Sequence, residues 1–198
     1  SNQQPKIVRF SNQLAQNQVI YKALSTLKEY GNIKNETQIR IIETELITMK
    51  NKGIGLEVDE KTIFNTRSER LAELSTIFSN NVLDATKNWS LLLKKRSEVE
   101  GLPERALETL ALAAKEAGDK DEEGNDPTAS EGPWRVGLDL PRYIPFQTYA
   151  KDRLVREKVY RAFVSRASDG KLSNKKIIEE ILDLRNKQAR QLGYENWC

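Results

Sequence analysis

The side chains that most often carry out chemistry in proteins are scarce in this sequence. Its 198 residues include no histidine and one cysteine, Cys198, which is the last residue. Histidine is the most frequent general base, a frequent zinc ligand and the usual partner that activates a serine or cysteine nucleophile. With no imidazole to take its proton, Cys198 is expected to be inert. The sequence therefore predicts no catalytic residue and no metal-binding residue, and it leaves the substrate-binding residues unknown.

The residues best suited to hold a ligand are arginines in one segment near the C-terminus. Acidic residues are interspersed among them, so the default interpretation is that they form ion pairs along a helix or between helices. The alternative is a clamp for a substrate carboxylate, which the planar guanidinium binds through two parallel hydrogen bonds. These residues are Arg153, Arg156, Arg161 and Arg166.

A basic run in the middle of the chain raises the question of nucleic-acid binding. Lys94, Lys95 and Arg96 form the densest basic run, but Glu98 and Glu100 lie close by and dilute its field. A nucleic-acid site needs a longer basic stretch with aromatic residues on which bases can stack. We interpret the run as a solvated face.

Two loop segments match ligand-binding loops only in part. The acidic run DKDEEGND (119–126) offers carboxylate oxygens, which suit calcium or magnesium. It does not have the spacing of an EF-hand loop, so a mobile acidic loop is expected. The sequence GIGLE (53–57) has two glycines but no preceding strand and no Walker lysine, and it is interpreted as a turn.

The elements that carry these residues are predicted to be mainly helices. Apolar residues at helical spacing, each run ended by a glycine, predict a helical hairpin over about 11–30 and 35–53. Asp59 is placed to cap a longer helix of about 30 residues, which would span about 45 Å. The residues that recur every seven positions along it are Phe64, Leu71, Phe78 and Ala85.

The C-terminal half combines helices with one short strand. Pro103 suits the first turn of a helix that ends at Gly118. Apolar residues then alternate with polar or small ones near 134–140, which is the period of a half-buried strand. Pro141 and Pro145 cannot donate to a strand ladder and are expected to end it, leading into a helix near Phe146. The remaining helices are predicted at about 147–167 and 174–192.

Together these elements predict an all-α fold, a multi-helix, bundle-like domain with one long helix and a short strand near 134–140. We expect a single helical domain over 1–198, with lobes at about 11–118 and 132–198 joined by the acidic loop 118–132. Hydrophobic residues make up 38% and charged residues 31% of the chain, which is typical of a soluble helical protein. No run approaches the roughly 18 apolar residues of a membrane span.

Several segments of the sequence resemble, in this order, the thimet oligopeptidase and oligopeptidase A family of zinc metallopeptidases. Their order and spacing together make the match strong, and it covers nearly the whole chain from about residue 15. The segments are KGIGLE (52–57), RLAELSTIFSNNVLDAT (70–86), GLPERALETLALAAKEAG (101–118), GPWRVGLDLPRYIPF (132–146), REKVYRAFVSRAS (156–168) and IIEEILDLRNKQARQLGYEN (177–196).

The resemblance implies a mostly helical, clamshell-like peptidase that hydrolyses short peptides in a deep channel with the help of zinc. The matching segments are those of the non-catalytic region that precedes the catalytic half. The zinc motif HExxH and its downstream glutamate belong to that later half, and no stretch here matches either of them. We therefore expect no cofactor in this chain, although the full-length family uses zinc, and we transfer no site residue.

The expected function is that of a catalytically inactive truncated relative or fragment of a zinc-dependent oligopeptidase, acting as a binding module if it is free. The segment GYENWC at 193–198 departs from the family pattern, which favours truncation. The alternative is the N-terminal part of a full-length zinc metalloendopeptidase that hydrolyses short peptides. A weaker alternative is a basic helical nucleic-acid-binding domain, although the net charge is only +3.

The expected partners are a second copy of the chain, a full-length relative or another protein, with no membrane and no nucleic acid. A single cysteine excludes an internal disulfide framework and favours a reducing compartment. We expect a cytoplasmic location, or an organellar one in a chloroplast or mitochondrion after loss of any transit peptide, and not secretion.

Overall fold

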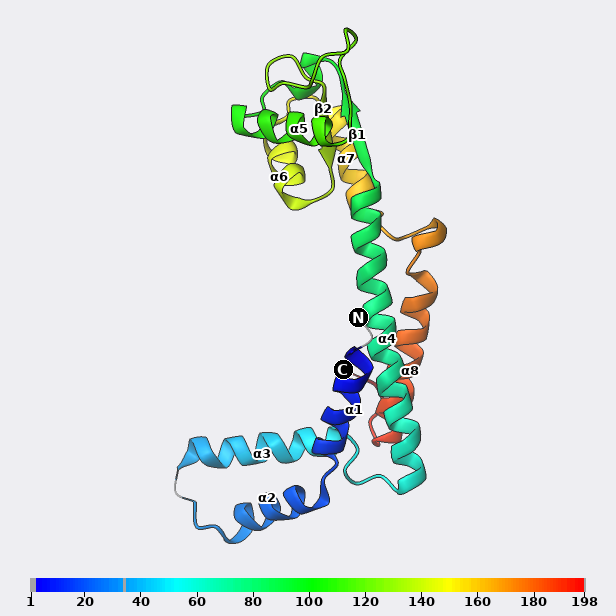
Figure 1. The fold of residues 1–198 in the computed structure, drawn as a ribbon. Helices are drawn as coiled ribbons and strands as arrows, with labels where there is room; N and C mark the ends of the chain where they lie inside the picture. The colour runs from blue at the N-terminus through cyan, green and yellow to red at the C-terminus, as the bar shows by residue number, and fades with distance from the viewer. Residues whose placement is uncertain (1–2, 34, 198) are drawn as a thin grey trace. The chain divides into compact units, whose positions relative to one another are not determined.

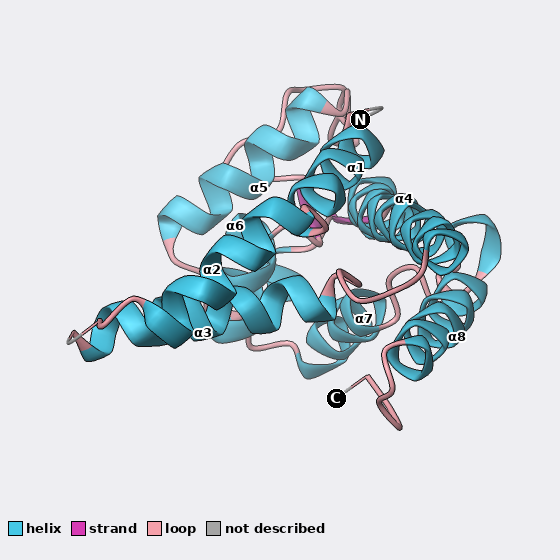
Figure 2. Cartoon of the chain, turned by 90° about the horizontal axis from the view of Figure 1, so that it is seen from below, coloured by secondary structure: helices cyan, strands magenta, loops and turns pink. Residues whose placement is uncertain are grey.

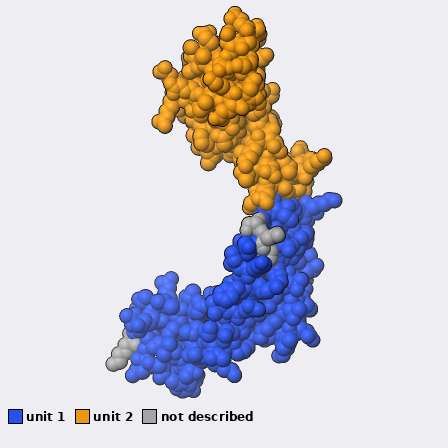
Figure 3. All heavy atoms as spheres, viewed as in Figure 1, with its two compact units in different colours: residues 1–78, 176–198 blue, residues 79–175 orange. Residues whose placement is uncertain are grey.

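The computed structural model describes residues 3–33 and 35–197, and Cys198 lies outside this part of the chain. It forms two compact units, one of residues 1–78 with 176–198 and one of residues 79–175 (Figure 3). These boundaries differ from those of the expected lobes, because the acidic loop 118–132 lies inside the second unit. Each unit is described by itself.

The described residues form eight α-helices and one two-stranded sheet, which confirms the predicted all-α class with a minor strand element. None of these helices combines the length and the apolar character that crossing a membrane requires.

The first unit contains three complete helices and most of two others. Figure 1 labels all five. Helices α2 and α3 contact each other as the predicted hairpin, and α4 and α8 run side by side in both views (Figure 2). Hydrogen bonds from the Gln188 side chain to Phe64 O and Ser68 Oγ join α8 to α4. The helices are α1 (Gln4–Ala15), α2 (Gln18–Tyr30), α3 (Glu36–Asn51), the part of α4 (Val58–Asn88) up to residue 78, and α8 (Lys175–Gln191).

Helix caps set the boundaries in this unit. The expected single helix over 11–30 is wrong, because the Asn17 side chain accepts hydrogen bonds from the amides of Val19 and Ile20 and so begins α2 as a separate helix. Asn35 caps α3 in the same way. Gly53 takes a φ of +82°, and the GIGLE segment is a turn, as predicted.

The long helix is confirmed, with 31 residues in α4. Of the seven-residue repeat, Phe64 is buried, and Leu71, Phe78 and Ala85 are half-buried. Leu74, between two members of the repeat, is buried as well. The other buried hydrophobic residues described in the first unit are Ile42, Leu46 and Met49 of α3, Ile54 in the turn and Ala189 of α8.

The second unit is built around a small antiparallel sheet. Strand β1 (Ser90–Leu93) pairs with β2 (Trp134–Gly137) in a register that places Leu91 opposite Val136 and Leu93 opposite Trp134. Helices α5 (Glu104–Glu116), α6 (Leu140–Tyr149) and α7 (Arg153–Val164) complete the unit, with short 3-10 turns η1 (Arg96–Val99) and η2 (Gly170–Leu172). The core cluster is Leu93, Val99, Leu102, Leu107, Leu110, Ala111, Trp134, Val136, Leu138, Phe146, Ala150 and Val159.

The strand predicted near 134–140 is confirmed as β2. It ends at Gly137, because Asp139 caps α6 through its side chain and the helix already begins at Leu140. Pro141 lies in the first turn of that helix, where its missing N–H has no intrahelical partner to lose.

The helix expected over 147–167 is two helices. The chain leaves α6 at Ala150, and the Asp152 side chain accepts hydrogen bonds from the amides of Leu154 and Val155 to begin α7. The helix expected over 174–192 corresponds to α8, and the one over 103–118 to α5.

Truncating the buried leucine of α5 should destabilise the chain far more than truncating an exposed one on the same helix. Leu110 is 2% exposed and Leu112 is 57% exposed. We expect Leu110→Ala to lower the free energy of unfolding by about 2–5 kcal/mol, because it leaves a cavity in the core. Leu112→Ala, the matched control, should change it by less than about 0.5 kcal/mol. Urea unfolding followed by tryptophan fluorescence measures both, and equal effects would contradict the described packing of α5.

Candidate functional site

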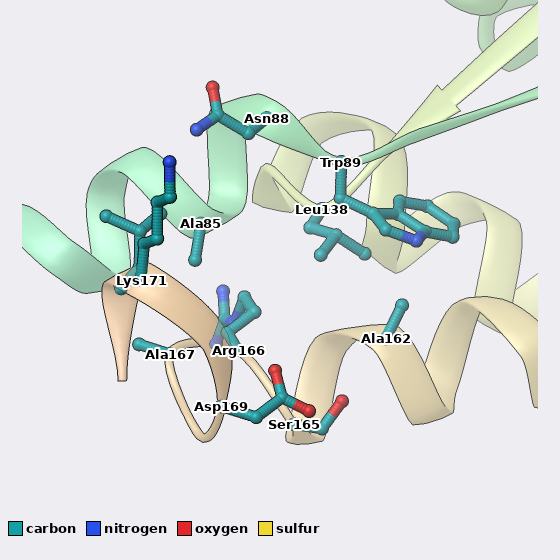
Figure 4. Close-up of a pocket in the computed structure, with 11 residues that line it drawn as sticks. Ala85, Asn88, Trp89, Leu138, Ala162, Ser165, Arg166, Ala167, Asp169 and Lys171 are labelled. Carbon is teal, nitrogen blue, oxygen red and sulfur yellow. The ribbon is translucent and has the colours of Figure 1, made fainter. Parts of the chain in front are cut away.

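The second unit contains a cleft of about 580 Å³, formed by the end of α4, the residue after β2, the end of α7 and the segment around η2 (Figure 4). A cleft of this volume is in the usual range for small-ligand sites. Its apolar lining is Ala85, Trp89, Leu138, Ala162, Ala167 and Leu172. Its polar lining is Asn88, Ser165, Arg166, Asp169 and Lys171.

The pairing of the two strands brings distant segments to this cleft. Ser90 is opposite Gly137 in the antiparallel register. The next residues outward, Trp89 and Leu138, therefore flank each other at the end of the sheet, and both line the cleft. Leu138 is 1% exposed, so it also ties the cleft to the core of the unit.

Arg166 is held in a fixed orientation on the cleft wall. Its guanidinium carbon lies 3.6 Å from the centroid of the Phe163 ring. Its Nε donates to the Phe163 carbonyl at 2.8 Å, and its Nη1 donates to Thr86 Oγ1 at 3.3 Å. A ring contact and two hydrogen bonds thus restrain a side chain that is otherwise among the most flexible.

Phe163 is itself fixed by a second aromatic ring. The ring of Tyr143 stacks on it with the centroids 3.9 Å apart and the planes 14° apart. Because both Tyr143 and Arg166 lie within 4 Å of the same ring centre, they must occupy its opposite faces. Burial, together with the nearby Tyr160, raises the pKa of the Tyr143 hydroxyl above its ordinary value. The hydroxyl is therefore neutral at physiological pH and serves the stack, not acid-base chemistry.

A left-handed residue turns the chain back over the cleft after α7. Ala167 has a φ of +53°, a conformation that costs a non-glycine residue about 1–2 kcal/mol. Its carbonyl accepts a hydrogen bond from the amide of Asn174 at 2.8 Å, and Asn81 of α4 donates to the Asn174 side chain at 2.9 Å. These bonds hold Arg166 and the following residues on the cleft wall.

The cleft has the parts of a binding site. Within the described chain, Arg166 has no carboxylate at ion-pair distance, whereas Arg135 and Arg142 of the same unit pair with Asp119 and Asp139. The Ser165 hydroxyl donates to the Arg161 carbonyl at 2.7 Å, an arrangement that does not activate it as a nucleophile. The arrangement therefore provides hydrogen-bonding groups beside an apolar surface.

The remaining arginines of the predicted clamp do not converge with Arg166. Arg161 forms an ion pair with Glu157 one turn away at 2.7 Å, as the default interpretation expects. Arg156 donates to the Ala150 carbonyl, and Arg153 is exposed at the beginning of α7. Of the four, Arg166 alone lines the cleft.

The basic run lies on the surface after β1. Lys94, Lys95 and Arg96 are exposed, and the Glu98 carboxylate accepts hydrogen bonds from the amides of Lys94 and Lys95. Arg96 also lies 5.7 Å from the ring centre of Trp134. The interpretation of this run as a solvated face stays a prediction.

The carboxylates of the acidic run are partnered by cations and amides of the protein. Asp119 accepts two hydrogen bonds of 2.6 Å from Arg135, and Asp121 accepts from the backbone and side chain of Asn125. Asp126 pairs with Lys115 and Lys120. Over residues 3–33 and 35–197 no three side chains of His, Cys, Asp or Glu gather closely enough to hold a metal ion.

Two family models match the ends of the chain. The N-terminal domain of neurolysin and thimet oligopeptidase matches residues 1–61, and peptidase family M3 matches residues 146–198. Residues 62–145, between the two matches, include most of α4 and the sheet.

Curated relatives match nearly the whole chain. A probable cytosolic oligopeptidase A of Arabidopsis thaliana is 42% identical, with 98% of this chain and 27% of the relative covered. The organellar, chloroplastic/mitochondrial oligopeptidase A of the same plant is 40% identical over 98% of this chain and 24% of the relative. Oligopeptidase A of Escherichia coli K12 is 36% identical over 98% of this chain and 28% of the relative. The chain spans about a quarter of the length of these relatives.

The lysine pair around Asp126 should make this carboxylate unusually acidic. Hydrogen bonds and charge from Lys120 and Lys115 lower the pKa of Asp126 from 3.8 to about 2. Because the folded pKa lies below the unfolded one, the pair's contribution to stability is present above pH 3.8 and is lost as the pH falls through about 2. Carbon-detected NMR titration of Asp126 measures the shift. Lys115→Gln and Lys120→Gln should each raise the pKa, and an ordinary value in the unsubstituted chain would contradict the described pairing.

Proposed function

We infer the function of this chain from its family, because it belongs to the N-terminal region of the oligopeptidases of peptidase family M3. We propose that it is the non-catalytic region of a zinc-dependent oligopeptidase and has no peptidase activity by itself. Hydrolysis of short peptides is the proposed activity of the whole enzyme. The chain's own contribution is then to bind, either to the rest of the peptidase or, where it is free, to a protein partner.

The observation that carries this proposal is the lack of histidine in all 198 residues. The zinc site of such a peptidase needs two imidazoles one helical turn apart, a carboxylate ligand and a glutamate that takes the proton of the bound water. The described residues also contain no cluster of His, Cys, Asp or Glu that would suit a metal. The residues present do not fit zinc, and we derive no step of hydrolysis through it.

Helix α1 supports a role in binding, because its polar side faces the first unit. Arg9 forms two hydrogen bonds of 2.9 and 2.8 Å with the Glu69 carboxylate of α4. Gln16 bonds to Asn65 of α4, and Asn12 between them in the helical repeat is 1% exposed. A surface helix normally buries its apolar stripe and leaves its polar side in water, so this arrangement is reversed.

The apolar stripe of α1 lies on the opposite side and is open to solvent. Ile7, Phe10 and Leu14 recur at helical spacing and are 58%, 66% and 53% exposed. Contiguous exposed apolar residues of this size are typical of a surface that a partner covers. We propose that the stripe packs against the remainder of the oligopeptidase in the whole enzyme, and that in a free chain it supports self-association.

The proposed location is the cytosol or an organelle. The names of two plant relatives support it, one being cytosolic and the other chloroplastic or mitochondrial.

The chain should not hydrolyse peptides when it is supplied with zinc. In an assay with an internally quenched fluorescent peptide, we expect no more turnover than in a buffer blank, because the imidazole ligands of zinc are missing from the sequence. A full-length oligopeptidase A serves as the positive control. Turnover that persists after repeated purification and disappears with a chelator would overturn the proposal.

Substitution of the α1 stripe should weaken self-association. We expect light scattering across a concentration series to show dimers of the unsubstituted chain, and Phe10→Ser combined with Leu14→Ser to raise the dissociation constant about tenfold or more. Ile41→Ser with Ile47→Ser removes two exposed apolar side chains of α3 and is the matched control, expected to leave the constant unchanged. A strictly monomeric chain at every concentration would sink the proposed self-association.

A further inference from the structure

We propose that the cleft lined by Arg166 binds a peptide through its C-terminal carboxylate, with an apolar last side chain on the cleft floor. The inference concerns the second unit alone, and it does not depend on the proposed function, because the residues that line the cleft all lie between 79 and 175. It follows from three features of the cleft: the fixed Arg166 guanidinium, the net charge at the rim and the apolar floor.

The Arg166 guanidinium is held in position to bind an anion, and the described chain places no carboxylate against it. Arg166 stacks on Phe163 at 3.6 Å and uses Nε and Nη1 in hydrogen bonds, while no bond of its Nη2 is found among the described residues. Of the other half-buried arginines of this unit, Arg135 and Arg142 are paired with carboxylates, and Arg156 donates to the Ala150 carbonyl. A guanidinium fixed in advance loses less conformational freedom when it binds a carboxylate, so the interaction is stronger.

The net charge at the rim of the cleft favours a ligand with a single negative charge. Lys171 and Arg166 are positive and Asp169 is negative, so one positive charge remains at the cleft. In the view of Figure 4, Asn88 and Lys171 lie on one side of Arg166, and Asp169 and Ser165 lie on the other. A carboxylate between Arg166 and Lys171 is attracted by both, whereas a phosphate dianion would leave an unbalanced charge beside Asp169.

Asp169, on the other side of Arg166, favours a ligand that carries a backbone N–H next to its carboxylate. Asp169 is exposed at the rim and would repel a second carboxylate. It can accept a hydrogen bond from the backbone N–H of the peptide's C-terminal residue, which a simple carboxylic acid lacks. The terminal carboxylate of the peptide thus accepts hydrogen bonds from Arg166 and Lys171, and its neighbouring N–H donates to Asp169.

The floor accounts for the apolar last residue. Ala85, Trp89, Leu138 and Ala162 line it, and Leu138 belongs to the buried core, so the floor is apolar and firmly supported. Burying a leucine-sized side chain there contributes about 1.5–3 kcal/mol if it is complete. The ligand class is therefore a peptide ending in a free carboxylate on an apolar residue.

Chemical-shift titration of the full isotope-labelled chain tests the proposal without any substitution. The probes are acetyl-Ala-Leu with a free carboxylate, its C-terminal amide, sodium acetate and inorganic phosphate. We expect the free acid to shift the amide signals of residues 85–89 and 165–171, and to bind at least about tenfold more tightly than the amide. Equal binding of acid and amide, or acetate or phosphate binding as tightly as the acid, would overturn the proposal.

Variants of the cleft give the second test. Arg166→Gln should weaken the free acid about tenfold or more, and Lys171→Gln, at an exposed position, by up to about fivefold. Arg105→Gln removes the same charge from an exposed site on α5, outside the cleft, and should leave affinity unchanged. If Arg166→Gln unfolds, Lys171→Gln and the amide comparison still decide. An equal loss in Arg105→Gln and Lys171→Gln would show general charge attraction and overturn the site.

Discussion

The pairing of β1 with β2 is the constraint on which the second unit depends. It joins residues 90–93 to residues 134–137 across a long intervening segment, and it buries Leu93, Trp134 and Val136 in one core. Because β1 follows directly on α4 and β2 is followed within three residues by α6, the register also sets where these helices leave the sheet. The position of Trp89 beside Leu138, and with it the floor of the cleft, is a consequence of that register.

Much of the helical structure could be predicted from the sequence because helix signals are local. The period of α4, the glycine that ends α3 and the proline before α5 each act within a few residues. Strand β1 was not predicted, because its three leucines, Leu91–Leu93, form a short apolar run without alternation just after a long helix. Only its pairing with a strand about 40 residues away makes it a strand.

Only one residue of the candidate cleft, Arg166, could be singled out from the sequence, because the cleft, like β1, depends on contacts between distant segments. Arg166 belongs to the arginine segment considered as a carboxylate clamp, but nothing local distinguishes it from Arg161, which pairs with Glu157. The difference arises from Phe163 and Thr86, one of which lies on another helix. Asn88 and Lys171, which join Arg166 at the cleft, come from segments whose closeness no sequence pattern reveals. Binding groups of this kind depend on tertiary structure, whereas the lack of imidazole is evident from composition alone.

The buried side of α1 has a consequence for how stability is distributed in the first unit. Within the described chain, neither Nδ2 nor Oδ1 of Asn12 has a hydrogen-bond partner, although both atoms are buried. Each such group costs about 1–3 kcal/mol in lost hydration, which opposes the docking of the helix. In the ion pair of Arg9 with Glu69 the arginine side chain is 63% exposed, so the pair is screened by water and offsets little of this cost. Helix α1 is therefore held on α4 more weakly than its contacts suggest, and its amides would exchange with solvent through local opening before the core of the unit unfolds.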